Sequence, residues 1–133
     1  MFELVVENLM GKVEWDPETR AVIKTFVGFV KGDPMKEIFD KGLAKLKYER
    51  GCIWISDNRK IKPYSTESIQ WINEDWFPRI KAAGWKYWPI VEPESVTGGL
   101  SMNNFTEFYA GEGIELHIVR TVEEAREWAK SKH

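Results

Sequence analysis

The sequence predicts one α/β domain in which a mixed β-sheet is flanked by helices. Near the start of the chain, three apolar segments are separated by turn residues, a pattern typical of antiparallel strands. After residue 32, helical apolar stripes alternate with short apolar runs, which indicates βα units with parallel strands and right-handed crossovers. The length of 133 residues fits one domain, and no repeat, low-complexity segment or linker divides residues 1–133.

The first three predicted strands form the antiparallel part of the sheet. Phe2, Leu4 and Val6 alternate with Glu3 and Glu7, and residues 12–15 alternate in the same way. Residues 21–27 are β-branched and nearly continuous. The tetrapeptide at residues 16–19, Asp-Pro-Glu-Thr, is a turn with proline at its second position. We therefore expect the third strand to pair back onto the second across this turn.

The first predicted helix follows these strands. We expect Asp33 to cap its free backbone N–H groups and Pro34 to occupy its first position, where a missing N–H has no consequence. Gly51 is expected to close the helix. A short strand over residues 52–56 comes next, and the polar residues 57–60 are expected to bound it.

The second predicted helix begins after Ser65, which is a candidate N-cap. Pro78 lies within its apolar stripe, removes one backbone hydrogen bond and predicts a kink near Glu74. The strand expected at residues 85–91 contains Pro89, which cannot donate to a ladder. We interpret this proline as a bulge or as the entry to the strand.

The rest of the chain predicts one more βα unit. Residues 92–100 indicate a loop with a Gly-Gly hinge, expected to be among the more mobile segments, and Ser101 is expected to cap a short helix. Residues 114–118 alternate as a strand does. Thr121 and Glu124 have the spacing of a capping box and predict the start of the last helix.

Three segments of the chain, together with the order of its elements, resemble bacterial SpoIIAA-like (STAS/SEC14-type) small domains. The segments are Cys52–Asp57, Ser65–Arg79 with its Trp-Ile-Asn-Glu-Asp-Trp-Phe-Pro-Arg run, and Thr121–Trp128. The resemblance extends over nearly the whole chain. It implies a mixed sheet flanked by helices, in a family that includes anti-sigma-factor antagonists and SEC14-type lipid carriers.

The resemblance also suggests a modification site. Antagonist domains carry a phosphorylatable serine at the start of the helix after the third core strand, and Ser65 and Thr66 fall at about that place. A phosphoryl group there would meet free N–H groups and the positive end of the helix dipole. Arg59, Lys60 and Lys62 precede this terminus and are a candidate anion-binding set. The alternative is that Ser65 serves only as an N-cap.

Aromatic residues provide a second candidate site. The chain has seven tryptophans and is 14% aromatic. Trp71 falls off the apolar stripe of its helix, and Trp85, Tyr87 and Trp88 crowd one strand. Such residues often anchor interfaces or line apolar pockets, so we expect them to form a ligand or partner surface. The alternative is that they only fill the core and its edges.

Catalytic and metal-binding patterns are missing from the sequence. Cys52, the single cysteine, begins an apolar strand and is expected to be buried and inert. His117 lies near Glu115 on one strand, and one histidine with one carboxylate is too few for a metal site. We find no nucleophile elbow and no phosphate-binding glycine loop, so we predict no catalytic residues, no metal and no cofactor.

We predict a non-catalytic interaction or regulatory domain that binds a protein partner or a small ligand. The alternative is a carrier or sensor of a small apolar or amphipathic ligand, held between residues 85–91 and 93–110. An enzyme of unknown reaction comes third. The net charge of −2 disfavours nucleic acid, no apolar run is long enough to span a membrane, and a homo-oligomer is left open. We expect a cytoplasmic protein.

Overall fold

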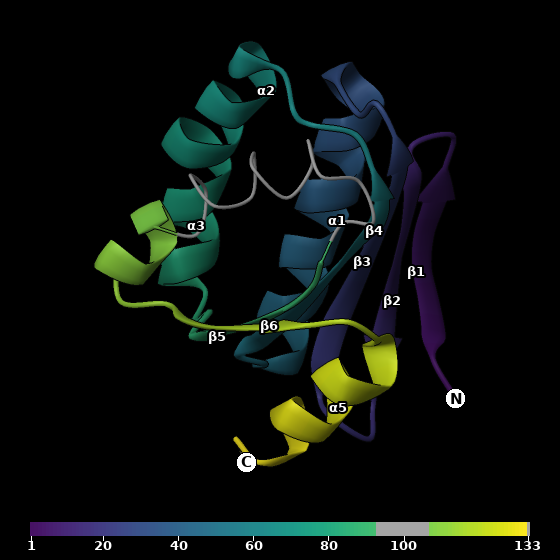
Figure 1. Cartoon of the computed structure of the whole chain (residues 1–133), viewed down its shortest axis with the longest axis vertical. Coiled ribbons are helices and arrows are strands. Elements are labelled where there is room, and N and C mark those ends of the chain that lie inside the picture. The colour runs from purple at the N-terminus through teal and green to yellow at the C-terminus, as the bar shows by residue number, and fades with distance from the viewer. Residues whose placement is uncertain (93–106, 133) are drawn as a thin grey trace.

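The computed structural model describes residues 1–92 and 107–132 and has the predicted α/β fold (Figure 1). Within these residues, six strands form one sheet whose spatial order is the order of the sequence. The strands are β1 (Glu3–Asn8), β2 (Gly11–Asp16), β3 (Ala21–Gly28), β4 (Ile53–Ile61), β5 (Tyr87–Val91) and β6 (Glu115–Val119). The named helices are α1 (Gly32–Glu49), α2 (Thr66–Trp71), the π-helical η1 (Ile72–Trp76), α3 (Phe77–Ala82) and α5 (Val122–Lys130).

The sheet changes character at β3. Strands β1, β2 and β3 are antiparallel neighbours, whereas β3, β4, β5 and β6 run parallel to one another. Helix α1 connects β3 to β4, and the continuous run of α2, η1 and α3 connects β4 to β5. This arrangement confirms the predicted antiparallel start followed by βα units.

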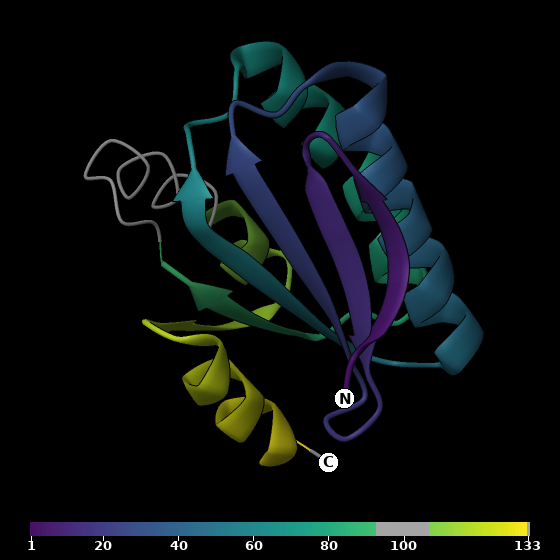
Figure 2. The same ribbon diagram turned by 90° about the vertical axis from the view of Figure 1, so that its right-hand side faces the viewer.

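Helices cover both faces of the sheet (Figure 2). Helices α1 and α3 lie on one face, and α5 packs on the other, against β4, β5 and β6. The face under α1 carries the larger core, which is rich in aromatic rings. The core under α5 is small and mostly aliphatic. Its buried members are Ala21, Ile23, Ile53, Ile55, Val91, Val119, Ala125 and Ala129.

Strand β4 is longer than the sequence predicts. We expected the polar residues 57–60 to bound it, but it continues to Ile61. Asp57 and Asn58 are buried within it, because β3 continues alongside and supplies backbone partners as far as Gly28. Buried polar groups need hydrogen-bond partners, and both side chains have them.

The ends of α1 differ from the prediction in detail. The N-cap is Lys31, which makes no side-chain capping bond, so Asp33 lies in the first turn, where its carboxylate faces the positive end of the helix dipole. At the other end, Arg50 adopts the left-handed conformation, and the N–H of Gly51 donates to Leu46 O at 2.9 Å. The closing left-handed residue is therefore Arg50 and not Gly51.

Pro78 and Pro89 each interrupt regular structure. The helix widens into the π-helical η1 directly before Pro78, at the place where a kink was expected, since proline removes one backbone bond there. Pro89 lies in the middle of β5 and not at its entry. Pairing of β5 with β4 skips residues 88 and 89, as expected for a residue that cannot donate.

The predicted caps of α2 and α5 are confirmed. The hydroxyl of Ser65 accepts from Ser68 N at 3.1 Å, and the hydroxyl of Thr121 accepts from Glu124 N at 3.1 Å. The predicted Gly-Gly hinge and the Ser101 cap lie outside the described residues, while residues 107–111 are helical. None of the helices in the described ranges has both the length and the apolar character needed to cross a membrane.

Candidate functional site

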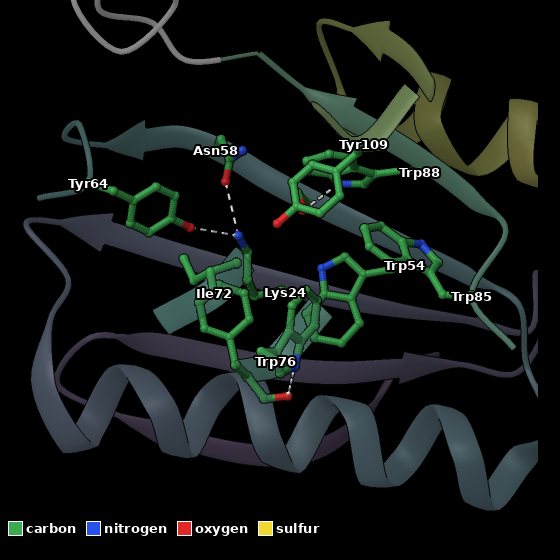
Figure 3. A pocket seen from close by; sticks show the side chains of 11 residues that line it. Lys24, Trp54, Asn58, Tyr64, Ile72, Trp76, Trp85, Trp88 and Tyr109 are labelled. Carbon is green, nitrogen blue, oxygen red and sulfur yellow. Dashed lines mark hydrogen bonds between the residues drawn. The ribbon is translucent and has the colours of Figure 1, made fainter. Parts of the chain in front are cut away.

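A cavity lies between the sheet and the helices of the aromatic face, with the side chain of Lys24 inside it (Figure 3). Strands β3, β4 and β5 contribute its floor, and α1, η1 and residue 109 contribute its walls and roof. The side chains that line it are Lys24, Phe39, Trp54, Ser56, Asn58, Tyr64, Ile72, Trp76, Trp85, Trp88 and Tyr109.

Alternation along two strands directs the polar groups into this cavity. On β3, Val22, Lys24 and Phe26 share the face under α1. On β4, Ser56 and Asn58 lie on the same face, and Ser56 is the register partner of Lys24. One lysine therefore enters a core that is otherwise built from rings and aliphatic groups.

Lys24 is 2% exposed and makes two long hydrogen bonds to neutral acceptors. Its ammonium donates to Asn58 Oδ1 at 3.3 Å and to Tyr64 Oη at 3.3 Å. The same nitrogen lies 4.5 Å from the ring centroid of Phe26 and 5.4 Å from that of Phe39. Aromatic faces attract a cation, so the rings partly replace the water that burial removes.

No carboxylate forms an ion pair with Lys24 among the described residues. The carboxylate of Asp57 acts electrostatically on Lys24 but does not contact it. Asp57 points to the other face of the sheet, where Arg59 binds it at 2.8 Å. Burial lowers the pKa of Lys24 to about 7, and Asp57 offsets only part of this effect. The amine is therefore partly uncharged at neutral pH.

Hydrogen bonds fix the orientation of the surrounding rings. Trp88 Nε1 donates to Ser56 Oγ at 2.8 Å, and Trp76 Nε1 donates to Phe39 O at 2.9 Å. Tyr109 donates from its hydroxyl to Asn73 Oδ1 at 2.8 Å. Because these polar edges are held by the protein, the rings present mainly apolar surface to the cavity.

The cavity is narrow. About 330 Å³ of space inside it, counted to its open mouth, is free of atoms, but the centre of a water-sized sphere reaches only about 20 Å³. That inner volume holds roughly one water molecule. The remaining space lies in gaps between rings that a water-sized sphere does not enter, so a ligand larger than one water molecule is admitted only when the rings move apart.

The structure separates the four aromatic residues predicted as one surface. Trp85 and Trp88 are buried and line the cavity, with ring centroids 5.3 Å apart. Tyr87 points to the opposite face and packs edge-on against Trp128 of α5. Trp71 is half-buried on α2, where its ring meets Phe39. The cavity therefore brings together two of the four.

The candidate phosphate site is also divided. Ser65 and Trp71 lie in an open groove between α2 and the start of α1. Arg59 is at the end of β4 and holds Asp57 through two bonds, from Nε at 2.9 Å and from Nη2 at 2.8 Å. Thr66 is exposed at the first residue of α2. Within the described residues, the lining of the groove includes neither Arg59 nor the two lysines that follow it.

Those lysines, Lys60 and Lys62, are exposed on the last part of β4 and just beyond it. The backbone N–H of Lys62 donates to Gly28 O at 3.0 Å, which ties this segment to the end of β3. These lysines therefore lie near the carboxyl ends of β3 and β4, and neither is among the residues that line the Lys24 cavity.

Histidine and cysteine occupy structural positions. His117 is exposed on β6 and stacks on Trp128 with ring centroids 5.1 Å apart. Cys52 is half-buried before β4, and burial raises the pKa of its thiol, which makes it a poor nucleophile. Among the described residues, no group of three or more His, Cys, Asp or Glu side chains is placed to hold a metal.

Lys24 is the residue that sequence reasoning missed. The signal was present, since Lys24 interrupts the apolar run of residues 21–27 and shares strand parity with Val22 and Phe26. Side chains two residues apart on a strand point to the same face. On a central strand, a lysine between two core residues of that face is therefore buried.

We compared the chain with protein-family models, curated proteins and solved structures, and none of them matches it. The SpoIIAA-like resemblance therefore stays a prediction.

Proposed function

We propose that this domain binds a small, flat ligand at the Lys24 cavity, whose rings move apart to admit it, with an uncharged oxygen of the ligand next to the lysine nitrogen. The observation that carries this proposal is a buried amine in a ring-lined cavity, with no carboxylate partner among the residues that the structure describes. Burying an ammonium among apolar groups is unfavourable unless strong partners compensate for the lost water. A ligand oxygen would supply such a partner.

The chemistry of the walls supports a flat and mostly apolar ligand. Ligand pockets combine apolar and aromatic linings with a few polar groups that fix orientation. Here Lys24, Asn58 and Tyr64 gather at one end of the cavity, and the hydroxyl of Ser56 accepts from Trp88. A ligand with a single polar end and a planar body matches that distribution, as in the amphipathic-ligand alternative predicted from the sequence.

Binding of simple fragments tests the proposal. Ligand-detected NMR with benzyl alcohol and benzamide at pH 7 measures affinity, and quenching of tryptophan fluorescence reports on the cavity, since four of its walls are tryptophans. We expect Lys24→Met to weaken binding by about tenfold, the effect of losing one hydrogen bond from a charged donor. The matched control is Lys132→Met, because Lys132 also lies over an aromatic ring, that of Trp128, but on the other face. Equal binding by both variants and the wild type would contradict the proposal.

A second candidate function is binding to a protein partner, and exposed apolar side chains favour it. Leu9 is 98% exposed, Phe29 71% and Val27 56%. Val27 lies beside the turn that follows Leu9, because Val27 N donates to Met10 O at 3.1 Å, and Phe29 follows Val27 by two residues. Exposed apolar patches of this kind often mark interfaces.

The simplest partner for this patch is a second copy of the chain. Sedimentation velocity over a hundredfold concentration range measures self-association of the wild type and of Phe29→Ser. We expect Phe29→Ser to reduce self-association. The control, Tyr48→Ser, changes an equally exposed ring on α1 and should leave it unaltered. A wild type that stays monomeric throughout would rule out the second copy as partner.

A further inference from the structure

The groove between the start of α1 and the start of α2 is separate from the Lys24 cavity and much roomier. Both helices begin where β3 and β4 end, at the same end of the sheet (Figure 1). A volume of about 630 Å³ in this groove is open to a water-sized sphere, which is within the range of pockets that hold small molecules. The described residues that line it are all different from those that line the Lys24 cavity. The groove therefore has room for a ligand without any movement of the protein.

An apolar surface forms one part of this groove, with Trp71 at its centre. The Trp71 ring packs against Phe39, with ring centroids 5.9 Å apart, and this contact holds it in place. Met10, Pro34 and Met35 add apolar surface around it. The half-buried Trp71 thus presents part of its ring to the groove, where a flat group can stack on it.

The indole N–H of Trp71 adds a hydrogen-bond donor. Within the described residues it donates to no acceptor, whereas three buried tryptophans donate theirs to protein oxygens. It is also not among the polar atoms that the described residues seal from solvent. A ligand in the groove can therefore accept from it.

Two lysines give the groove a positive edge. Lys31 is the exposed N-cap residue of α1, and Lys36 Nζ lies 5.5 Å from the ring centroid of Trp71. Neither forms an ion pair in the part of the chain that the structure describes. Other lysines do have carboxylate partners, namely Lys12, Lys45, Lys130 and Lys132.

Helical spacing keeps the acidic residues of the same turns away from this groove. Asp33 and Glu37 are four residues apart and line a different groove beside the β1–β2 turn, where Asn8 Nδ2 donates to Glu37 at 2.7 Å. Among the described residues that line the groove at Trp71, the one carboxylate is Glu67 on α2. Two ammonium groups against one carboxylate favour an anion over a cation or a neutral ligand.

We infer that this groove binds a small organic monoanion with a flat apolar body, of the class of aromatic carboxylates. The flat body lies against the Trp71 ring, and the carboxylate accepts from Lys31 and Lys36, whose ammonium groups are carried on flexible four-carbon stems. Glu67 disfavours a second negative charge, so a carboxylate matches the groove better than a phosphate monoester does. This inference goes beyond the proposed function, because both the site and the charge of the ligand differ.

Titration with 2-naphthoate tests the inference on the full chain. The indole N–H signals of nitrogen-15-labelled protein are followed by NMR at pH 7, and Trp71→Phe identifies the Trp71 signal. We expect 2-naphthoate to shift that signal, and the uncharged analogue 2-naphthamide to bind about tenfold more weakly, since it lacks the charge that the two lysines attract. Raising NaCl from about 20 to about 500 mM should weaken binding of the carboxylate severalfold and leave that of the amide unchanged.

Substitution of the lysines is the second arm of the test. Lys36→Gln should weaken 2-naphthoate binding by about threefold and the double variant Lys31→Gln/Lys36→Gln by about tenfold, because each exposed charge contributes little alone. The matched control is Lys41→Gln, an exposed lysine of α1 that does not line the groove, and it should bind like the wild type. Equal affinity of the double variant and the control would overturn the inference. A shift of the tryptophan signals of the Lys24 cavity without a shift of Trp71 would also overturn it, and would leave the proposed function to the test with uncharged fragments.

Discussion

The two faces of the sheet bury charged groups in opposite ways. On the face under α5, Asp16 is fully buried and accepts hydrogen bonds from Arg126 Nε at 2.7 Å and from Thr19 Oγ1 at 2.7 Å. On the face under α1, Lys24 is as deeply buried but has two neutral acceptors and no carboxylate contact among the described residues. The first charge is fully compensated, whereas the second is not.

The cores that surround Asp16 and Lys24 also differ in how closely they are packed. Small aliphatic side chains pack against the alanines of α5, and the hydrogen bonds of Asp16 join that helix to the turn between β2 and β3. Large rings meet edge to face under α1 and leave narrow gaps between them. The α5 face is packed around a compensated charge, whereas the α1 face has a narrow cavity beside an amine without a charged partner among the described residues.

The largest effect that we predict concerns Lys24. Burying its amine reduces stability at pH 7 by roughly 4–5 kcal/mol, since its pKa falls from 10.5 to about 7. The unfolded chain binds the proton more tightly, so the stability of the wild type should increase by about 2 kcal/mol between pH 7 and 9. Lys24→Met should be more stable at pH 7 by about 3 kcal/mol and lack this increase. Urea unfolding at pH 6 to 9 measures both, and a flat wild-type profile would contradict the prediction.

On the face under α5, we expect removal of a charged side chain to destabilise the protein. Arg126→Ala leaves the buried carboxylate of Asp16 without its charged donor and should reduce stability by about 2–3 kcal/mol. Burial alone would raise the pKa of Asp16, but the bonds from Arg126 and Thr19 bring it below its usual value. Its contribution is therefore present above pH 4 and lost as the pH falls through the lowered pKa, so the variant should lose less stability on acidification.

Thermal melts at pH 3 and 7 check this prediction, with Lys130→Ala as control. Lys130 contacts Glu18 at the exposed rim of the same network, so its removal should leave the melting temperature nearly unchanged. If Arg126→Ala melted like Lys130→Ala, the buried carboxylate would not depend on Arg126.

A smaller effect is expected where α1 approaches the rings. A Cβ atom added at Gly42 would lie 2.5 Å from Trp54 Cη2, too close for the two atoms. Gly42→Ala should therefore reduce stability by about 1–2 kcal/mol, despite the better helix propensity of alanine. Gly111→Ala is the matched control, because no atom of the described residues lies within 4 Å of its added Cβ, and it should stabilise by about 0.5 kcal/mol. Chemical unfolding measures the free energy of unfolding of both variants. Equal changes in the two would show that the Trp54 ring moves aside at little cost, against the prediction.

Local sequence signals predict most of the fold but not the site. The caps at Ser65 and Thr121 and the order of strands and helices follow from short-range patterns, and the structure agrees with them. The extension of β4 could not be predicted in this way, because Asn58 is buried only when β3 places Lys24 beside it, 34 residues away in the chain. The same holds for the cavity, whose rings come from separate elements and meet only in the folded domain.

The identity of spatial and sequence order in the sheet has a consequence for how the protein folds. In the part of the chain that the structure describes, every strand after β1 pairs with the strand that precedes it in the sequence. Each new strand pair therefore brings together segments that are separated by only a hairpin turn or one crossover connection. The chain can therefore assemble from β1 onward while it is still being synthesised, each new strand adding to an edge that already exists.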